Sequence, residues 1–316
     1  MTARDRAFWL RVQRRAAQLQ PELAAALLRA YAIIRASFSE AELTRLIDRG
    51  AFDLLVHQVL ADDVLDRAFL PLRAKLRASV AQQIAYFARD LPKAGKIDGV
   101  LVVAFDYLNP RVIDAIRGLD SKVLTTLKSD VRETVRAFVE HGIRDGDAPR
   151  TIAREFRDVV GLAPNQAEAV RNFERALRGE PGAANPLSYQ LRDRRFDAAI
   201  RSGELAPAKI DTMVAAYEKR LIAFHANTIA RTAAVDAMKV GQQLSWESAV
   251  DRGIVDGDRL TKTWVSAGDD RVRDEHQAME GETVPYDEPY SNSEDVPGES
   301  VYNCRCISRF AVGRAA

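Results

Sequence analysis

The spacing of apolar residues constrains the fold of this chain more than any other sequence feature. Up to about residue 250, apolar residues recur at intervals of three and four, and few stretches alternate as strands do. One such series comprises Ile210, Val214, Tyr217, Leu221, Phe224 and Thr228. This spacing is typical of amphipathic helices, which bury one apolar face. The bulk of the chain is therefore predicted to be α-helical.

Local signals predict where some of these helices begin and end. Pro21 predicts a break between two short helices, because proline lacks the N–H that an interior helical position donates. Ser39 with Glu42 is a capping-box signal for the next helix. Asn109-Pro110 predicts another helix start, and Ser121 predicts a further cap.

A long helix is expected at about residues 206–240, where the apolar stripe is close to a heptad repeat. Such a stripe usually packs into the core of its own chain. A partner helix from another subunit is the alternative, although two or three heptads are marginal for a coiled coil.

Turn-rich segments and a change of pattern predict three consecutive regions. Residues 91–96 form a break, residues 178–186 have the Gly/Pro density of an exposed loop, and the helical pattern ends near Gly253. Residues 261–265 and 306–310 then have the composition of strands. The predicted fold is mainly α: an elongated multi-helix region followed by a small, loop-rich α+β module. The regions are an N-terminal helical region, a central helical region with the long helix, and the C-terminal module, at 1–92, 93–252 and 253–316.

Composition and charge exclude several classes of protein. The 46 Lys and Arg residues nearly balance the 45 Asp and Glu residues, so the formal charge of +1 gives no overall attraction to DNA or anionic membranes. The basic groups around Arg14 and around Arg194 are short or interleaved with acids, which favours solvated helix faces over DNA sites. The apolar runs are too short to span a bilayer, and we expect no membrane contact. Two cysteines exclude a disulfide framework.

The sequence contains no recognisable catalytic constellation. It has no nucleophile elbow, no P-loop, no dinucleotide-binding glycine motif and no His-Glu-x-x-His. His57, His141 and His225 lie in helical surroundings without an obvious acid or nucleophile as partner. The chain is therefore not expected to be an enzyme.

The C-terminal region carries an ordered set of residues that together form a specific pattern. Its members are Trp264, Asp270, Arg271, His276, Gly281, Asn303, Cys304, Arg305 and Cys306. This order resembles the phage head morphogenesis family named after the Mu F protein. Upstream, Arg231-Thr232 resembles the family's Ala-Arg-Thr-Glu helix, with Ala233 in place of the usual Glu. With residues 104–110 and 187–196 included, the resemblance extends over about 100–310.

The resemblance implies a minor head (capsid) protein of a tailed bacteriophage. Such a protein acts in procapsid and head assembly, with the portal protein, the major capsid or scaffold protein and packaged DNA as its expected partners. It is made in the host cytoplasm and then located in the virion head interior or at the portal vertex. The alternatives are a metal-dependent nucleic-acid-processing enzyme and a DNA-binding packaging accessory. The first ninety residues carry no resemblance and could adapt the protein to its portal or capsid.

His276, Cys304 and Cys306 form a candidate zinc site, because thiolate and imidazole are the usual ligands of Zn²⁺. Structural zinc sites prefer four ligands and wider cysteine spacing, so two buried thiols with a hydrogen-bonded histidine are the favoured interpretation, and no cofactor is expected. Nearby, Asp270 is expected to accept backbone N–H bonds in a turn, and Arg271 to pair with a carboxylate. The Asn303 side chain is expected to bond to the backbone and hold the last strand.

Overall fold

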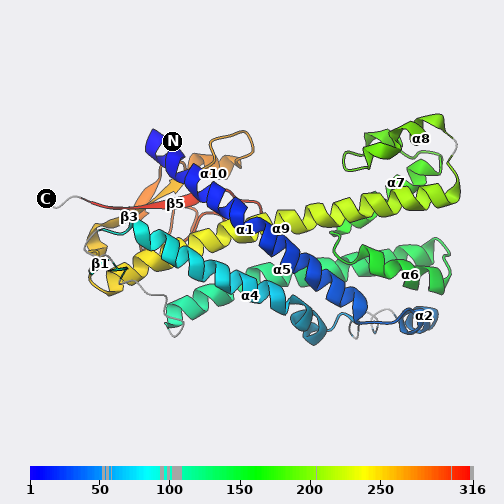
Figure 1. The fold of residues 1–316 in the computed structure, drawn as a ribbon, viewed down its shortest axis with the longest axis horizontal. Helices are drawn as coiled ribbons and strands as arrows, with labels where there is room; N and C mark the ends of the chain where they lie inside the picture. Colours follow the sequence, from blue (N-terminus) through cyan, green and yellow to red (C-terminus); the bar gives the residue numbers. More distant parts are fainter. Residues whose placement is uncertain are drawn as a thin grey trace. The chain divides into compact units, whose positions relative to one another are not determined.

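The chain is mainly α-helical, as predicted, with a small α+β module near its C-terminus. The computed structural model describes residues 1–316 except 52–53, 55–56, 58, 93–95, 98–99, 102–108, 204, 300 and 314–316. The α-helices shown in Figure 1 are α1 (Ala3–Ala36), α2 (Glu40–Asp48), α4 (Asp62–Phe87), α5 (Pro110–Arg144), α6 (Pro149–Val159), α7 (Pro164–Leu177), α8 (Asp197–Ser202), α9 (Pro207–Asp251) and α10 (Asp274–Ala278). The strands are β1 (Lys96–Ile97), β2 (Val100–Leu101), β3 (Leu260–Val265), β4 (Thr283–Pro285) and β5 (Ile307–Val312).

Helix α1 is continuous through Pro21, so the predicted break there is wrong. Pro21 and Ala17, whose carbonyl would otherwise accept the missing bond, both lie on the exposed face of the helix. The buried face continues past this point with Leu19 and Leu23. Packing of this face therefore outweighs the loss of one hydrogen bond.

The other helix signals had mixed outcomes. The predicted cap at Ser39 is confirmed, since its hydroxyl accepts the Glu42 N–H at 3.2 Å. Helix α5 begins at Pro110, and Asn109 accepts the Arg111 N–H at 3.0 Å, as predicted. Ser121 does not cap a helix, because α5 runs through it from Pro110 to Arg144. Its apolar face is unbroken there, with Leu119 and Val123 both buried.

Helix α9 begins where the long helix was predicted but ends at Asp251 instead of near residue 240. The additional turns stay helical because Leu244, Trp246 and Ala249 continue the buried face. Gly253 follows with φ 67°, a conformation that glycine adopts without strain, and the helical region ends there, as predicted.

The chain divides into two compact units, each assembled from several segments. Unit 1 comprises residues 1–23, 72–123 and 228–316, and unit 2 comprises residues 24–71 and 124–227. Long helices contribute to both units. The sequence predicts a division of the chain into consecutive regions at 1–92, 93–252 and 253–316. That division stays a prediction.

Unit 2 is a helical unit with an aromatic interior. Helix α2 packs against α6, and the rings of Phe38 and Phe156 meet edge to face with centroids 4.8 Å apart. The ring of Phe173 of α7 contacts those of Tyr189 and Tyr217, with centroids 5.1 and 4.6 Å away. The predicted loop at 178–186 is confirmed as turns with exposed or half-exposed residues.

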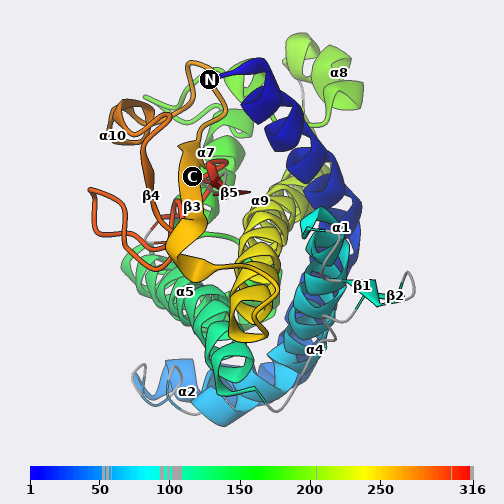
Figure 2. The same cartoon turned by 90° about the vertical axis from the view of Figure 1, so that its left-hand side faces the viewer.

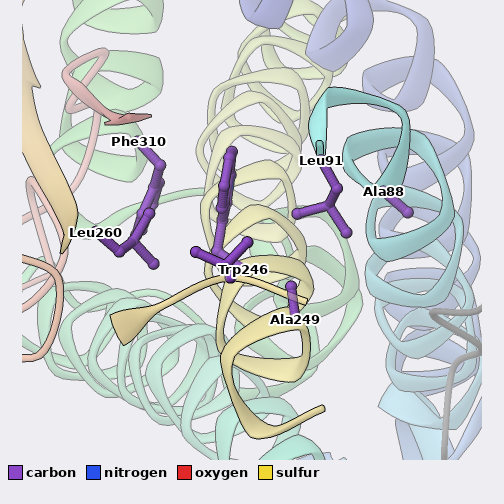
Figure 3. Close-up of a cluster of buried hydrophobic side chains, with 7 residues drawn as sticks. Ala88, Leu91, Trp246, Ala249, Leu260 and Phe310 are labelled. Atoms are coloured by element: carbon purple, nitrogen blue, oxygen red, sulfur yellow. The ribbon is translucent and has the colours of Figure 1, made fainter. Parts of the chain in front are cut away.

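Unit 1 contains a three-stranded antiparallel sheet in the order β4-β3-β5. Strand β3 confirms the predicted strand near residues 261–265, and β5 confirms the last strand, starting at Ile307. A hydrophobic cluster joins this sheet to helices of the same unit. Figure 3 shows Trp246 of α9 between Phe310 and Leu260 on one side and Leu91 on the other. Trp246 and Phe310 stack with ring centroids 5.8 Å apart, which fixes the sheet against α9.

No helix among the described residues combines the length and the apolar character that crossing a membrane requires.

Candidate metal centre and its supporting contacts

The C-terminal module, residues 253–316, is centred on Trp264 of β3. This side chain is fully buried and contacts Tyr290 and His276 edge to face, with centroids 5.1 and 5.3 Å away. Cys304 and Cys306 complete the same cluster. Figure 2 shows α10, β3, β4 and β5 gathered in one part of the unit. Trp264 thus joins His276, Cys304 and Cys306 of the predicted motif in one small core.

His276, Cys304 and Cys306 meet in this core, as the sequence led us to expect. Their ligand atoms lie within 4.8 Å of one another, and all three side chains are buried. The His276 Nδ1 atom is 3.4 Å from the Cys304 Sγ atom and 3.8 Å from the Cys306 Sγ atom. The predicted contact between the histidine and the cysteines is therefore confirmed.

The pKa values of the two thiols are shifted in opposite directions. A hydrogen bond from Cys306 lowers the pKa of Cys304 to about 5, and the charges of Lys239 and His276 act in the same direction. The pKa of Cys306 is raised, first by its hydrogen bond to Cys304 and then by burial. The hydrogen bond between the two sulfurs thus shifts the pKa values of the pair in opposite directions.

Lys239 supplies a buried positive charge beside these sulfurs. Its side chain is 4% exposed, and its Nζ atom donates to the Pro297 carbonyl at 2.6 Å and to Asp236 at 3.3 Å. Burial alone would lower the pKa of Lys239, but Asp236 and the two cysteines offset this effect, and the pKa is raised. Lys239 is therefore a cation that balances negative charge in the core.

Asp236 also accepts from Lys122 of α5, whose Nζ atom lies 2.8 Å away and donates to the Gly298 carbonyl at 3.1 Å. Helices α5 and α9 thus hold the loop that precedes Cys304 through two lysines and one carboxylate. Sequence reasoning missed this network. A signal in the sequence was the spacing of Asp236 and Lys239, three residues apart, which places both side chains on one side of the helix.

Gly298 allows the loop to pass close to Cys304. A Cβ atom added at Gly298 would overlap the Cβ and Sγ atoms of Cys304. The backbone at Gly298 also has φ 72°, which other residues adopt only with strain. No larger residue fits there without displacing the thiol.

A polar clamp fixes the turn after β3, but its carboxylate is Asp269 and not the predicted Asp270. Arg305 donates to both carboxylate oxygens of Asp269, at 2.7 and 2.5 Å, and these bonds hold the pKa of that carboxyl well below its usual range. Asp269 also accepts the Arg271 backbone N–H at 3.2 Å and lies 3.4 Å from the Arg271 guanidinium. Asp270 is exposed. With two adjacent aspartates, only the strand geometry decides which one faces Arg305.

Asn303 joins the module to α9, in a manner different from the prediction. Its side-chain oxygen accepts from the Arg231 guanidinium at 2.8 Å, a side-chain partner in place of the expected backbone one. Its backbone N–H donates to the Thr232 hydroxyl at 3.2 Å. Asn303 adopts φ 60°, a conformation that asparagine tolerates better than most residues. The Arg231-Thr232 pair and the terminal motif are therefore one structural feature.

Gly281 and Arg273 complete the placement of the predicted residues. Gly281 turns the chain after α10 with φ 85°, and its N–H donates to the Trp264 carbonyl at 3.0 Å. Nearby, Arg273 donates to the Tyr302 carbonyl at 2.9 Å. It therefore supports the segment before Cys304.

The first turns of α1 also support the module. The Trp9 indole N–H donates to the Arg305 carbonyl at 2.8 Å, and Arg309 donates to Asp5 at 2.5 Å. Figures 1 and 2 both place the start of α1 beside this module. At least part of the N-terminal ninety residues thus has a structural role within unit 1.

Outside the module, several of the charged groups considered in the sequence have nearby partners. Arg192 donates to both oxygens of Asp197 at 2.9 Å, and Arg195 pairs with Asp193 at 2.7 Å and lowers its pKa to about 2. His225 does have an acidic neighbour, contrary to expectation. Its Nε2 atom lies 3.6 Å from Asp130, and its Nδ1–H donates to the Gly161 carbonyl at 3.0 Å. These contacts are typical of structural residues.

Comparison with known families identifies the part of the chain that contains this site. Residues 190–309 match the family described as Phage Mu protein F like protein. The predicted resemblance is confirmed for these residues, which we call the Mu F-like segment. The segment includes α9, the Arg231-Thr232 pair, the Asp269 clamp and the three candidate ligands. The match begins at residue 190 and not near residue 100, and most of the predicted similar stretch at 104–110 lies outside the described residues. No curated protein and no solved structure matches the chain.

Proposed function

We propose that this chain is a minor head protein of a tailed bacteriophage, acting in procapsid and head assembly. The observation that carries the proposal is the match of residues 190–309 to the Phage Mu protein F like family. Residues that first suggested this family contact one another within that segment: Arg231 donates to Asn303, and Trp264 packs with Cys304 and Cys306. The family match and these contacts therefore concern the same segment of the chain, residues 190–309.

The proposed partners are the portal protein and the major capsid or scaffold protein, with packaged DNA as a further contact. On this proposal the chain is made in the host cytoplasm and then resides in the head interior or at the portal vertex. The N-terminal region would adapt the protein to its particular portal or capsid.

We propose a structural role and not a catalytic one. The three candidate ligands are at most 4% exposed, so a substrate cannot reach them without opening the module. Arg192 and Arg195 are paired with aspartates, which weakens their attraction to a nucleic acid backbone. Both observations favour an assembly protein over a metal-dependent nuclease or a DNA-binding accessory.

The test is a phage in which the gene for this chain is deleted and then supplied in trans. We expect the deletion to reduce the yield of normal heads in electron micrographs and the intact gene to restore it. A chain carrying Asp269→Ala and Arg305→Ala, which lacks the clamp, should restore fewer heads than the intact chain. Normal heads in the deletion phage, together with absence of the chain from procapsids and virions, would refute the proposal.

A further inference from the structure

We infer that His276, Cys304 and Cys306 bind one Zn²⁺ ion that links α10 to the segment leading into β5. The inference starts from the distances between the side-chain atoms and not from the presence of Cys and His alone. The ligand atoms of the three residues come together from segments 28 and 30 residues apart, within 4.8 Å of one another.

The distances fit the ligand sphere of zinc. Zinc bonds of about 2.3 Å to sulfur and about 2.0 Å to nitrogen, at a tetrahedral angle, place the two ligand atoms about 3.5 Å apart. The His276 Nδ1 atom is 3.4 and 3.8 Å from the two sulfurs. These two separations match those expected around one zinc ion, and the two sulfurs lie within 4.8 Å of each other.

The surroundings suit thiolate ligands. The Trp264 indole nitrogen is fully buried beside these residues and has no hydrogen-bond partner among the described residues. Lys239 adds a buried positive charge that offsets the anionic sulfurs. Groups around a metal site orient the ligands and tune the metal, and Trp264 and Lys239 are such groups here.

Three protein ligands leave one coordination position. Within the described part of the chain, no further His, Cys, Asp or Glu joins the three, so a water molecule completes the tetrahedron. Because the ligands are buried, the ion acts as a cross-link within the module. Zinc binding would then stabilise the folded module, since the unfolded chain does not assemble the ligands.

The experiment uses the full-length chain, purified under reducing conditions without chelator. Elemental analysis should give about one zinc per chain, and Co²⁺ added to the metal-free chain should give the visible d–d and near-ultraviolet thiolate bands of a tetrahedral site. His276→Ala should reduce zinc to a small fraction and abolish these bands. His276→Cys, which keeps a soft ligand at the same place, should retain the metal.

His225→Ala is the matched control, because His225 is another buried histidine of the chain, outside the module. It should leave the zinc content unchanged. Circular dichroism establishes that each variant keeps its helices. The inference is overturned if the folded, reduced chain neither contains nor takes up zinc, or if Cys304→Ser with Cys306→Ser binds zinc as the parent does. These outcomes do not depend on the proposed role in head assembly.

Discussion

Unit 2 and the C-terminal module are stabilised in different ways. In unit 2, large apolar side chains such as Phe156 and Phe173 are at most 1% exposed, while charge pairs such as Arg178–Glu174 lie near the surface, with both partners more than a third exposed. In the module, Trp264 is surrounded by few other large apolar groups. Buried or half-buried polar groups hold the segments together, among them Lys239 and the Asp269–Arg305 pair.

The difference follows from the size of each core. A helix can bury a continuous apolar stripe, whereas a three-stranded sheet with long loops buries little apolar surface per residue. Charge-assisted hydrogen bonds can tie such loops, provided that each buried group has a partner. We therefore expect unit 2 to be sensitive to loss of apolar volume, and the module to be sensitive also to loss of single polar groups.

The largest effect is expected from removing apolar volume in unit 2. Phe156→Ala should lower the free energy of unfolding by about 3–5 kcal/mol, because it leaves a cavity where the ring met Phe38. Phe224 is the matched control: it belongs to the same unit and is 53% exposed, so Phe224→Ala should change stability by less than about 0.5 kcal/mol. Urea unfolding of both variants measures the difference. Equal effects would contradict an apolar basis for unit 2.

A smaller, pH-dependent effect is expected at Glu218, a partly buried carboxyl of unit 2. Burial, with the charges of Asp158 and Glu155, raises the pKa of Glu218 to about 8 from an ordinary value of 4.5. The folded state therefore keeps a proton that the unfolded state has lost. The stability that this group contributes is fully present below pH 4.5 and is lost as the pH rises through 8.

Glu218→Gln cannot ionise and should remove this loss. Thermal unfolding should show that the variant gains stability relative to the parent between pH 5 and pH 9. If the difference in thermal stability between the variant and the parent were the same at pH 5 and pH 9, the raised pKa of Glu218 would be contradicted.

The smallest effects on stability are expected from polar contacts, and they should differ between the module and unit 2. Asp269→Asn replaces the carboxylate that pairs with Arg305, and it should lower the stability of the module by about 1–2 kcal/mol. Glu174→Gln alters an exposed pair in unit 2 and should cost no more than about 0.5 kcal/mol. Hydrogen exchange resolves the two regions separately. A larger effect for Glu174→Gln would reverse the comparison.

The sequence predicted the helical part of the fold well because apolar spacing reports directly which helix face is buried. It failed at Pro21 and Ser121, where local preferences predicted breaks. Both residues lie in helices whose buried faces continue on either side, and packing along the whole helix outweighs one proline or one serine.

The candidate site was only partly predictable. The contact between His276 and the two cysteines was expected from residue types and their order. The bonds of Lys122 and Lys239 to the Gly298 and Pro297 carbonyls were not, since these partners lie 176 and 58 residues away in the sequence and no short motif connects them. The choice of Asp269 over Asp270 likewise depends on the direction in which the strand ends, which composition does not specify.

On the proposed function this chain is a minor component of the phage head, and its amount per head tests that role most directly. Quantitative mass spectrometry of purified procapsids and virions should find the chain in a few copies per head, far below the major capsid protein. The chain with Asp269→Ala and Arg305→Ala should be incorporated less than the parent. Absence of the intact chain from both kinds of particle, or an amount equal to that of the major capsid protein, would contradict the account.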